Sequence, residues 1–180
     1  PQSLTDTFIE KTKSNTGWQI DKDWVVWVPG GVVGLNVACK TVLAPGDMAM
    51  VPSPIYAPFT EAPENMERGF VKTYLKDSNG RLELDFDEIG TLLSEDTKLL
   101  FLCNPHNPGG SVFSQEELTE LSRLCEENGV IVCSDEIHSD LVLDEGLKHI
   151  PFATINEHNQ ENSITIMGPC KTYNLAGFPI

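Results

Sequence analysis

The stretch Ser163-Ile-Thr-Ile-Met-Gly-Pro-Cys-Lys171-Thr-Tyr-Asn-Leu-Ala-Gly177 places a lysine directly after an apolar segment. Its β-branched first half predicts a strand, and Gly168-Pro169 predicts the turn that ends this strand. A side chain just past such a turn lies at the carboxyl end of a sheet, where open α/β folds bind their ligands. A partly desolvated lysine there can lose its proton and attack a carbonyl carbon to form a Schiff base. A lone lysine after a turn is more often an ordinary surface residue, so the rest of the chain must decide.

Apolar runs alternate with amphipathic segments along the rest of the chain. The runs predict strands at 24–28, 48–51, 70–74, 98–103 and 130–133, and the segments predict helices at 32–43, 85–93 and 114–128. Ser114 and Glu117 form a capping box, which defines where the last of these helices begins. Strands that alternate with helices predict an α/β fold of three layers, α/β/α, with a mostly parallel, doubly wound sheet. We expect residues 1–23 to form a helical lead-in and residues 24–180 to form one domain.

Composition narrows the function classes. The 180 residues carry 12 basic and 27 acidic side chains, a net charge of −15, which argues against a nucleic-acid surface. No apolar run approaches the ~18 residues that span a bilayer, and we expect neither a signal sequence nor a membrane partner. The five cysteines are odd in number and form no Cys-x-x-Cys pair, which favours free thiols and a cytoplasmic location. The four histidines lack metal-ligand spacing, and we predict no metal site.

Four further groups of residues follow predicted strands or turns. Pro29-Gly-Gly31 before a helix aims backbone N–H groups at an anion, although tight packing explains such a turn equally well. Tyr56 emerges at a strand end, where it either stacks on a planar ligand or caps the core. Asn104-Pro-His-Asn107-Pro-Gly-Gly110 is a shaped loop or a plain double turn. Asp135 directly follows a buried strand, where an aspartate either caps the following turn or serves as a buried counter-ion. His138 lies three residues later, and the simpler interpretation gives it a structural role.

The set Tyr56, Asn107-Pro-Gly-Gly, Ser134-Asp-Glu-Ile-His138 and Lys171-Thr-Tyr-Asn resembles the large domain of fold-type I pyridoxal-phosphate enzymes, the class I/II aminotransferase superfamily. The spacings also match, with 28 residues from Asn107 to Asp135 and 36 from Asp135 to Lys171. The motifs are most similar to the cystathionine β-lyase, or carbon–sulfur lyase, branch of that family. The resemblance covers residues 18 to 180.

The resemblance implies a role for each candidate residue. Lys171 would hold pyridoxal 5′-phosphate as a Schiff base and then act as the base at the substrate Cα. Asp135 would pair with the pyridine nitrogen and keep it protonated. Asn107 would donate a hydrogen bond to the phenolic oxygen of the cofactor, and Tyr56 would stack on its ring. The backbone N–H groups of Gly31-Val32-Val33 would bind its phosphate. Histidine at His138, where many aminotransferases have tyrosine, fits the lyase branch.

Three positions depart from the family pattern. Gly168 stands where the family usually has serine or threonine, Pro179 where most aminotransferases have an arginine, and Cys170 where the lyase branch often has serine. Hydroxyl and guanidinium groups at the first two positions bind phosphate in the family. The resemblance therefore implies fewer phosphate contacts from this segment than other family members make.

Three functions compete on this basis. The first is a carbon–sulfur β-lyase that cleaves S-substituted cysteines to a thiol, pyruvate and ammonia. The second is a class I/II aminotransferase that transfers an amino group to a 2-oxo acid, because both reactions use the same lysine and the same proton abstraction. The third is a non-catalytic aminotransferase-like module of the kind found in transcription regulators. The basic region that such regulators place before the domain is not visible in residues 1–23, and the acidic balance disfavours DNA.

The resemblance also implies a longer chain and a homodimer with active sites at the subunit interface. An upstream arm and a downstream small domain that binds the substrate carboxylate would complete the enzyme. We therefore expect an incomplete large domain that retains the cofactor weakly and shows no measurable turnover. An antiparallel strand should begin near 178–180, and its loss predicts a gap beside 24–28, a changed strand order or pairing with another copy.

Overall fold

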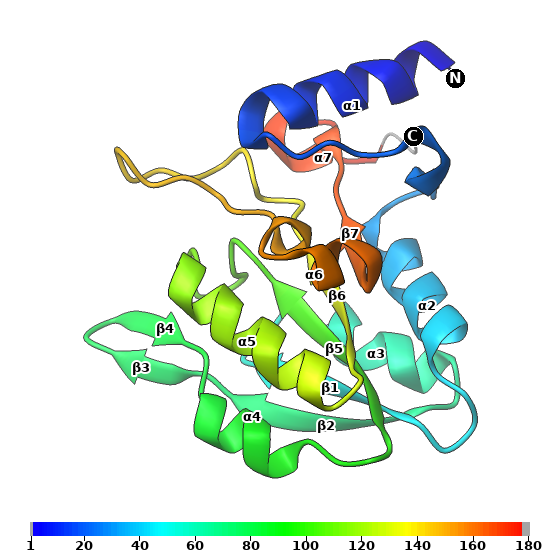
Figure 1. Cartoon of the computed structure of the whole chain (residues 1–180), viewed down its shortest axis with the longest axis vertical. Coiled ribbons are helices and arrows are strands. Elements are labelled where there is room, and N and C mark those ends of the chain that lie inside the picture. The colour runs from blue at the N-terminus through cyan, green and yellow to red at the C-terminus, as the bar shows by residue number, and fades with distance from the viewer. Residues whose placement is uncertain (1, 178–180) are drawn as a thin grey trace.

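Five parallel strands form the central sheet of the computed structural model, which describes residues 2–177 (Figure 1). Their order across the sheet is β2-β1-β5-β6-β7. The strands are β1 (Met48–Ser53), β2 (Gly69–Tyr74), β5 (Thr97–Cys103), β6 (Ile131–Asp135) and β7 (Ser163–Ile166). Every neighbouring pair is parallel, so all five carboxyl ends lie at one edge of the sheet. The predicted α/β class is confirmed.

Helices cover both faces of this sheet. One face packs against α2 (Gly31–Val42) and α3 (Pro58–Asn65), and the other against α4 (Phe86–Leu92), α5 (Gln115–Glu127) and the short η2 (Phe152–Thr154). The helix α6 (Glu157–Glu161) leads from η2 into β7. Among the described residues, no helix combines the length and the apolar character needed to cross a lipid bilayer.

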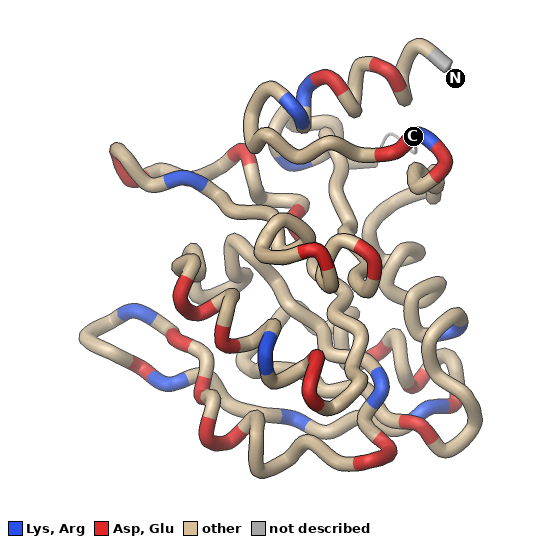
Figure 2. The backbone as a smooth tube through the Cα atoms, viewed as in Figure 1, with Lys and Arg blue, Asp and Glu red and all other residues tan. Residues whose placement is uncertain are grey.

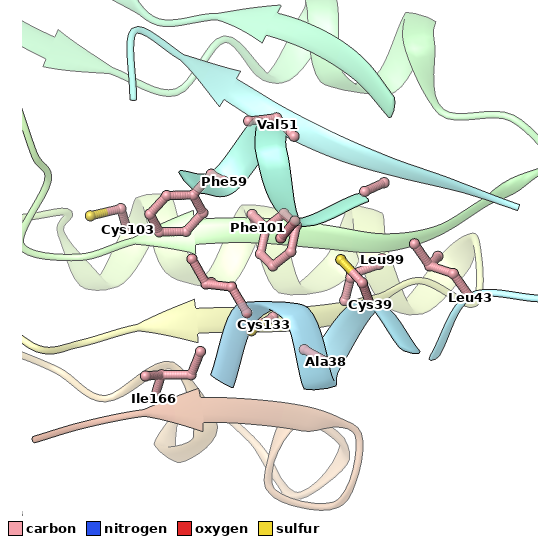
Figure 3. Close-up of a cluster of buried hydrophobic side chains, with 13 residues drawn as sticks. Ala38, Cys39, Leu43, Val51, Phe59, Leu99, Phe101, Cys103, Cys133 and Ile166 are labelled. Carbon is pink, nitrogen blue, oxygen red and sulfur yellow. The ribbon is translucent and has the colours of Figure 1, made fainter. Parts of the chain in front are cut away.

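The central strand β5 supplies both cores because successive side chains of a strand point to opposite faces. Leu99, Phe101 and Cys103 enter the core under α2 and α3, and Leu100 and Leu102 enter the core under α4 and α5. Figure 3 shows the first of these cores around Phe101, whose ring meets that of Phe59 edge to face at 5.4 Å. The sheet is therefore buried on both sides, as a parallel sheet requires.

The N-terminal helix α1 (Gln2–Thr16) lies above the sheet next to the last described helix, α7 (Pro169–Thr172) (Figure 1). The Trp27 indole donates a hydrogen bond to Thr5 Oγ1 over 3.0 Å, and its ring contacts Phe8. Lys11 forms an ion pair with Asp140 and lies over the Tyr173 ring. These contacts join the first and last described parts of the chain.

The strand predicted at 24–28 is wrong. The chain forms the short helix η1 (Lys22–Trp24) and then runs extended without pairing to any strand of residues 2–177. An apolar run becomes a strand only where a neighbouring strand accepts its hydrogen bonds. The sheet order is continuous, and the run 24–28 is left outside it. The residues expected to begin the missing strand, 178–180, lie outside the described residues.

Two further elements differ from the sequence prediction. β1 continues through Pro52 to Ser53, although proline was expected to end it at Val51. This is tolerated because β5 pairs only with Met48–Met50, so Pro52 faces no partner on its β5 side. The predicted turn after Tyr74 belongs to a hairpin of β3 (Lys76–Ser78) and β4 (Arg81–Glu83), with both turn residues at positive φ.

Charged side chains are spread over every layer of the molecule. Figure 2 shows acidic residues on the helices, on the loops and near the sheet, interspersed with basic ones. The acidic residues behind the net charge of −15 thus lie along much of the chain.

Candidate active site

The predicted site residues follow four different strands or begin a helix. Tyr56 lies beyond β1, Asn107 beyond β5, Asp135 at the end of β6, His138 three residues later, and Lys171 on α7 beyond β7; Gly31, Val32 and Val33 form the first turn of α2. Because the strands are parallel, the five side chains that follow them gather at the same edge of the sheet.

Asp135 is buried at the carboxyl end of β6. Only 8% of the residue is exposed, and its Oδ1 accepts a hydrogen bond from the Ile137 backbone N–H over 3.1 Å. The pKa of the Asp135 carboxyl is raised to about 6, chiefly by burial and to a lesser extent by the Glu136 carboxylate. The Ile137 N–H and the positive charge of Lys171 act in the opposite direction. The cationic and hydrogen-bonding groups around Asp135 therefore do not fully offset the cost of burying its negative charge.

Lys171 lies on the single-turn helix α7, and its side chain is exposed. The turn is closed by hydrogen bonds from Tyr173 N to Pro169 O (2.9 Å) and from Leu175 N to Cys170 O (2.9 Å). The neighbouring residue Thr172 donates a hydrogen bond to Asp140 Oδ2 over 3.1 Å. Hydrogen bonds of the neighbouring residues thus fix the helical turn that carries Lys171.

His138 is half-buried and lies within the electrostatic influence of Lys171. Burial lowers the pKa of the His138 imidazole, and the Lys171 charge lowers it further, whereas the Pro105 carbonyl acts in the opposite direction. Lys171 therefore influences both Asp135 and His138. Neutral imidazole is the favoured form of His138 at neutral pH.

Asn107 and His138 line one open cavity of about 440 Å³. The rest of its lining comes from the same loop and from the segment after His138: Pro105, His106, Pro108, Gly110, Val112, Leu141, Val142, Leu143 and Asp144. Tyr56, Asp135, Lys171 and the first turn of α2 are outside this lining. The structure thus brings Asn107 and His138 together in one hollow and leaves Tyr56 exposed at the end of β1.

The loop that carries Asn107 is held by buried contacts. The Asn107 N–H donates to Cys103 Sγ over 3.4 Å, and the Cys103 thiol contacts the Pro105 carbonyl at 3.5 Å. His106 Nδ1 accepts a hydrogen bond from Gly109 N–H over 3.1 Å. A Cβ on Gly109 would lie 2.6 Å from Leu82 and 2.7 Å from that same Nδ1, so a larger residue would displace these side chains. The seven-residue segment is a shaped loop and not a plain double turn.

The first turn of α2 presents backbone donors without an acceptor of its own. Gly34 N–H makes the first bond of the helix, to Gly30 O over 3.1 Å, so the N–H groups of Gly31, Val32 and Val33 precede it. The N-cap is Gly30 at φ 115°, a conformation that glycine tolerates and that supplies no capping side chain. The first turn contains no acidic residue. Its amides suit an anion.

Four residues that shape this edge were not identified from sequence. Cys103 fastens the Asn107 loop, Asp140 fastens α7, and Glu136 forms a buried pair with His149. Glu136 stands inside the motif Ser134-Asp-Glu-Ile-His138, so a motif search could have singled it out. The other three residues either lie in a plain apolar run, as Cys103 does, or contact a residue distant in sequence, as Asp140 and His149 do, and sequence offers no signal for them.

Comparisons with known proteins agree with the motif-based resemblance. The profile of the family Aminotransferase class I and II matches residues 2–180. Cystathionine beta-lyase PatB of Bacillus subtilis (strain 168) is 39% identical over 177 residues, which cover 98% of this chain and 46% of PatB. The chain therefore spans about half the length of this relative.

Solved structures show the same fold. The crystal structure of OvoB superposes with a TM-score of 0.96 at 40% identity and covers 99% of this chain and 47% of that chain. The PLP-bound C-S lyase from Staphylococcus hominis superposes with a TM-score of 0.90 at 35% identity, covering 96% and 44% respectively. The expected three-layer architecture and the family resemblance are confirmed.

Proposed function

The chain belongs to the aminotransferase class I and II family, and from this premise we propose that it is the cofactor-binding part of a pyridoxal-phosphate-dependent carbon–sulfur β-lyase. Such an enzyme cleaves S-substituted cysteines to a thiol, pyruvate and ammonia. The similarity to PatB and to the C-S lyase of Staphylococcus hominis supports the lyase over other members. The single observation that carries the proposal is that Lys171 lies within electrostatic reach of both Asp135 and His138 at one edge of the sheet.

The residues of this edge fit pyridoxal 5′-phosphate. The buried Asp135 carboxyl, with its raised pKa, would gain from a cationic ring nitrogen beside it. The first turn of α2 offers backbone donors to a phosphate, which compensates for the missing hydroxyl at Gly168. Lys171 offers an exposed amine to an aldehyde. The donor set therefore contains an anion site, a counter-ion and a nucleophile.

Each residue then has a defined task. With the cofactor bound, Asp135 would hold a proton at the ring nitrogen, Asn107 would donate to the phenolic oxygen, and Tyr56 would cover the ring face. Lys171 would hold the cofactor and would serve as the base that takes the proton from the substrate Cα. The bound cofactor supplies an electron sink for the charge left at Cα. His138, kept neutral by burial and by Lys171, completes the wall of the site.

Attachment of the cofactor tests this assignment directly. We expect incubation with pyridoxal 5′-phosphate and then borohydride to label the peptide containing Lys171, as measured by mass spectrometry. Lys171→Ala should lose the label, and Lys148→Ala, which removes an exposed lysine of the 139–150 segment, should keep it. Labelling that survives in Lys171→Ala would refute the role of this lysine. Asp135→Ala should still be labelled, and in a longer chain that includes the small domain it should lose turnover.

An aminotransferase remains the second candidate, because the matching family profile carries that name. Pyruvate release from cystathionine, compared with transamination that depends on a 2-oxo acid, separates the two activities. A non-catalytic module is the third candidate and predicts neither activity. Because relatives are about twice as long, a longer chain that includes the small domain should be assayed alongside this one.

We include the assembly and location in the proposal. A homodimer with active sites at the subunit interface follows from the family resemblance, and sedimentation velocity would measure it. A cytoplasmic location is supported by five free cysteines. We likewise retain residues 24–180 as the cofactor-binding domain, with 1–23 as its helical lead-in.

A further inference from the structure

Glu136 follows Asp135 directly and is fully buried, with 0% of its side chain exposed. Its Oε1 accepts hydrogen bonds from Ser134 Oγ and from the Phe152 backbone N–H, each over 2.9 Å. Its Oε2 lies 2.7 Å from His149 Nε2, and the His149 side chain is 4% exposed. A carboxylate this deep is stable only when its oxygens are all paired, and here three donors surround it.

The hydrogen-bond partners of His149 also determine which of its ring nitrogens carries the proton. His149 Nδ1 is buried and has no hydrogen-bond partner among the described residues. A proton on Nδ1 would therefore be a buried donor without an acceptor, so the ring carries its proton on Nε2 and donates it to Glu136. In this tautomer all three neighbouring donors point at the two Glu136 oxygens, which matches the acceptor-only character of a carboxylate. The pair thus leaves one negative charge next to Asp135.

The same contacts close a loop at its base. Ser134 precedes the 137–148 segment, and His149 and Phe152 follow it, so Glu136 binds both ends of the excursion. His138 lies in this loop. Asp140, also in the loop, accepts the hydrogen bond from Thr172 beside Lys171. The position of the loop therefore affects two groups of the candidate site, the His138 imidazole and the helical turn that carries Lys171.

We propose that Glu136 and His149 are positioning residues of this site, which close the base of the 137–148 loop and hold a fixed negative charge beside Asp135. The significance for catalysis rests on the proposed function, whereas the arrangement itself does not need the cofactor. The charge makes the Asp135 carboxyl more basic, in agreement with the raised pKa of that group. A more basic Asp135 holds a proton at a ring nitrogen more firmly.

Other ionisable groups that act on Asp135 are known from the structure. Lys171 lowers the Asp135 pKa, and the thiols of Cys103 and Cys133 lie within its electrostatic reach. Burial raises the pKa of the Cys103 thiol to about 12 and that of Cys133 well above its ordinary value, so both stay protonated. Glu136 is thus the neighbouring negative charge whose removal should be visible in the Asp135 titration.

The test uses the cofactor-free chain and two variants, Glu136→Gln and His149→Gln. Carboxyl ¹³C NMR measures the Asp135 pKa, and hydrogen exchange with mass spectrometry measures the opening of residues 137–148. We expect Glu136→Gln to lower the Asp135 pKa below about 6, because the Glu136 charge is lost while burial, the larger cause of the raised pKa, remains. His149→Gln, which keeps the charge, should leave the Asp135 pKa at about 6 or higher. Both variants should speed exchange of the loop about tenfold or more.

Glu126→Gln is the matched control, because Glu126 forms an exposed pair with His158 at 3.8 Å. It should change neither measurement. An equal fall of the Asp135 pKa in both test variants would mean that lost burial alone is responsible, and it would overturn the charge role. Unchanged loop exchange would overturn the closing role.

Protection of the β5 amides checks that each variant is folded. If Glu136→Gln fails this check, His149→Gln decides alone, because it must keep the Asp135 pKa and still loosen the loop. None of these measurements involves pyridoxal phosphate. A chain that fails to bind the cofactor would therefore contradict the proposed function without affecting this result.

Discussion

At the scale of single residues, the buried Asp135 makes stability depend on pH. Its pKa is about 6 in the fold and 3.8 in an unfolded chain, so the fold binds its proton more tightly. The resulting stabilisation is fully present below pH 3.8 and is lost as the pH rises through about 6. At ~1.4 kcal/mol per pKa unit, the loss is on the order of 3 kcal/mol.

Asp135→Asn should remove this dependence in the cofactor-free chain. We expect the variant to match or exceed the wild type at pH 7 and to show a smaller fall of the free energy of unfolding between pH 4 and 7. Urea unfolding at several pH values measures both quantities. Equal slopes for the two proteins over this range would contradict the raised pKa.

Gly109 is the second residue with a sharp prediction. An alanine Cβ would lie 2.6 Å from Leu82 and 2.7 Å from His106 Nδ1, so either the loop or the imidazole must move. We expect Gly109→Ala to cost ~1–3 kcal/mol of stability, the usual cost of overpacking, measured by thermal unfolding. Gly90→Ala in α4 is the control, because the added Cβ would meet only Leu124 of α5, at 3.9 Å, and alanine should stabilise α4 slightly.

The site residues show what sequence can and cannot predict at this scale. Asp135 and Lys171 were singled out because each follows a predicted strand, and parallel strands bring such positions to one edge, whereas His138 became a candidate only through the family resemblance. The role of Glu136 was not predictable, because its partner His149 is 13 residues away across a loop without regular structure. A burial of 0% is a property of packing and cannot be inferred from an acidic residue in a motif.

At the scale of elements, the start of α5 depends on one capping box. Ser114 Oγ accepts the Glu117 N–H, and Glu117 Oε2 accepts the Ser114 N–H over 2.8 Å. Ser114→Ala should cost ~1 kcal/mol. Glu117→Gln should cost more, because Glu117 also binds Arg81 of β4 and thereby holds the hairpin against the helix.

Thermal unfolding of both variants, with Ser139→Ala as a control outside any helix, measures the difference. Arg81→Ala combined with Glu117→Gln should cost less than the two single changes added together, since the two residues share one contact. Strict additivity of the single changes would contradict a direct interaction between hairpin and helix.

Helices and strands were predictable from sequence where the local sequence pattern and the tertiary packing favour the same structure. The capping box of α5 and the buried run of β5 are cases in which sequence pattern and packing coincide. The run 24–28 has the composition of a strand but no strand beside it, so the local preference had no hydrogen-bond partner to satisfy. At Pro52 the local signal favours the end of a strand, yet β1 continues to Ser53. This is possible because β5 no longer pairs with β1 at that position.

At the scale of the whole molecule, Asp140 joins three distant segments. It accepts hydrogen bonds from Thr172 on α7 and pairs with Lys11 on α1, while itself lying in the loop after β6. Asp140→Asn should therefore increase hydrogen exchange in α1 and α7 together. Asp144→Asn, which makes the same charge change in the same loop, is the control and should leave both helices unchanged.

The ion pair is partly exposed, so its effect on global stability should be below ~1 kcal/mol and should shrink in high salt. Exchange in α1 alone, without α7, would contradict the role of Asp140 as a shared anchor. The sequence predicted a mostly parallel sheet but not this link, because alternation of elements specifies layers and says nothing about which termini meet.

The buried thiols have a practical consequence for following the motions of this fold. Cys39 lies on α2, Cys103 on β5, Cys125 on α5 and Cys133 on β6, so every layer carries its own native probe. Burial raises the pKa of the first three thiols to about 11, 12 and 12, so a thiol reagent can reach them as thiolates only after local opening. The half-buried Cys170 beside Lys171 should react first. The order in which the other four are then labelled would record, without any engineered marker, the order in which the layers come apart.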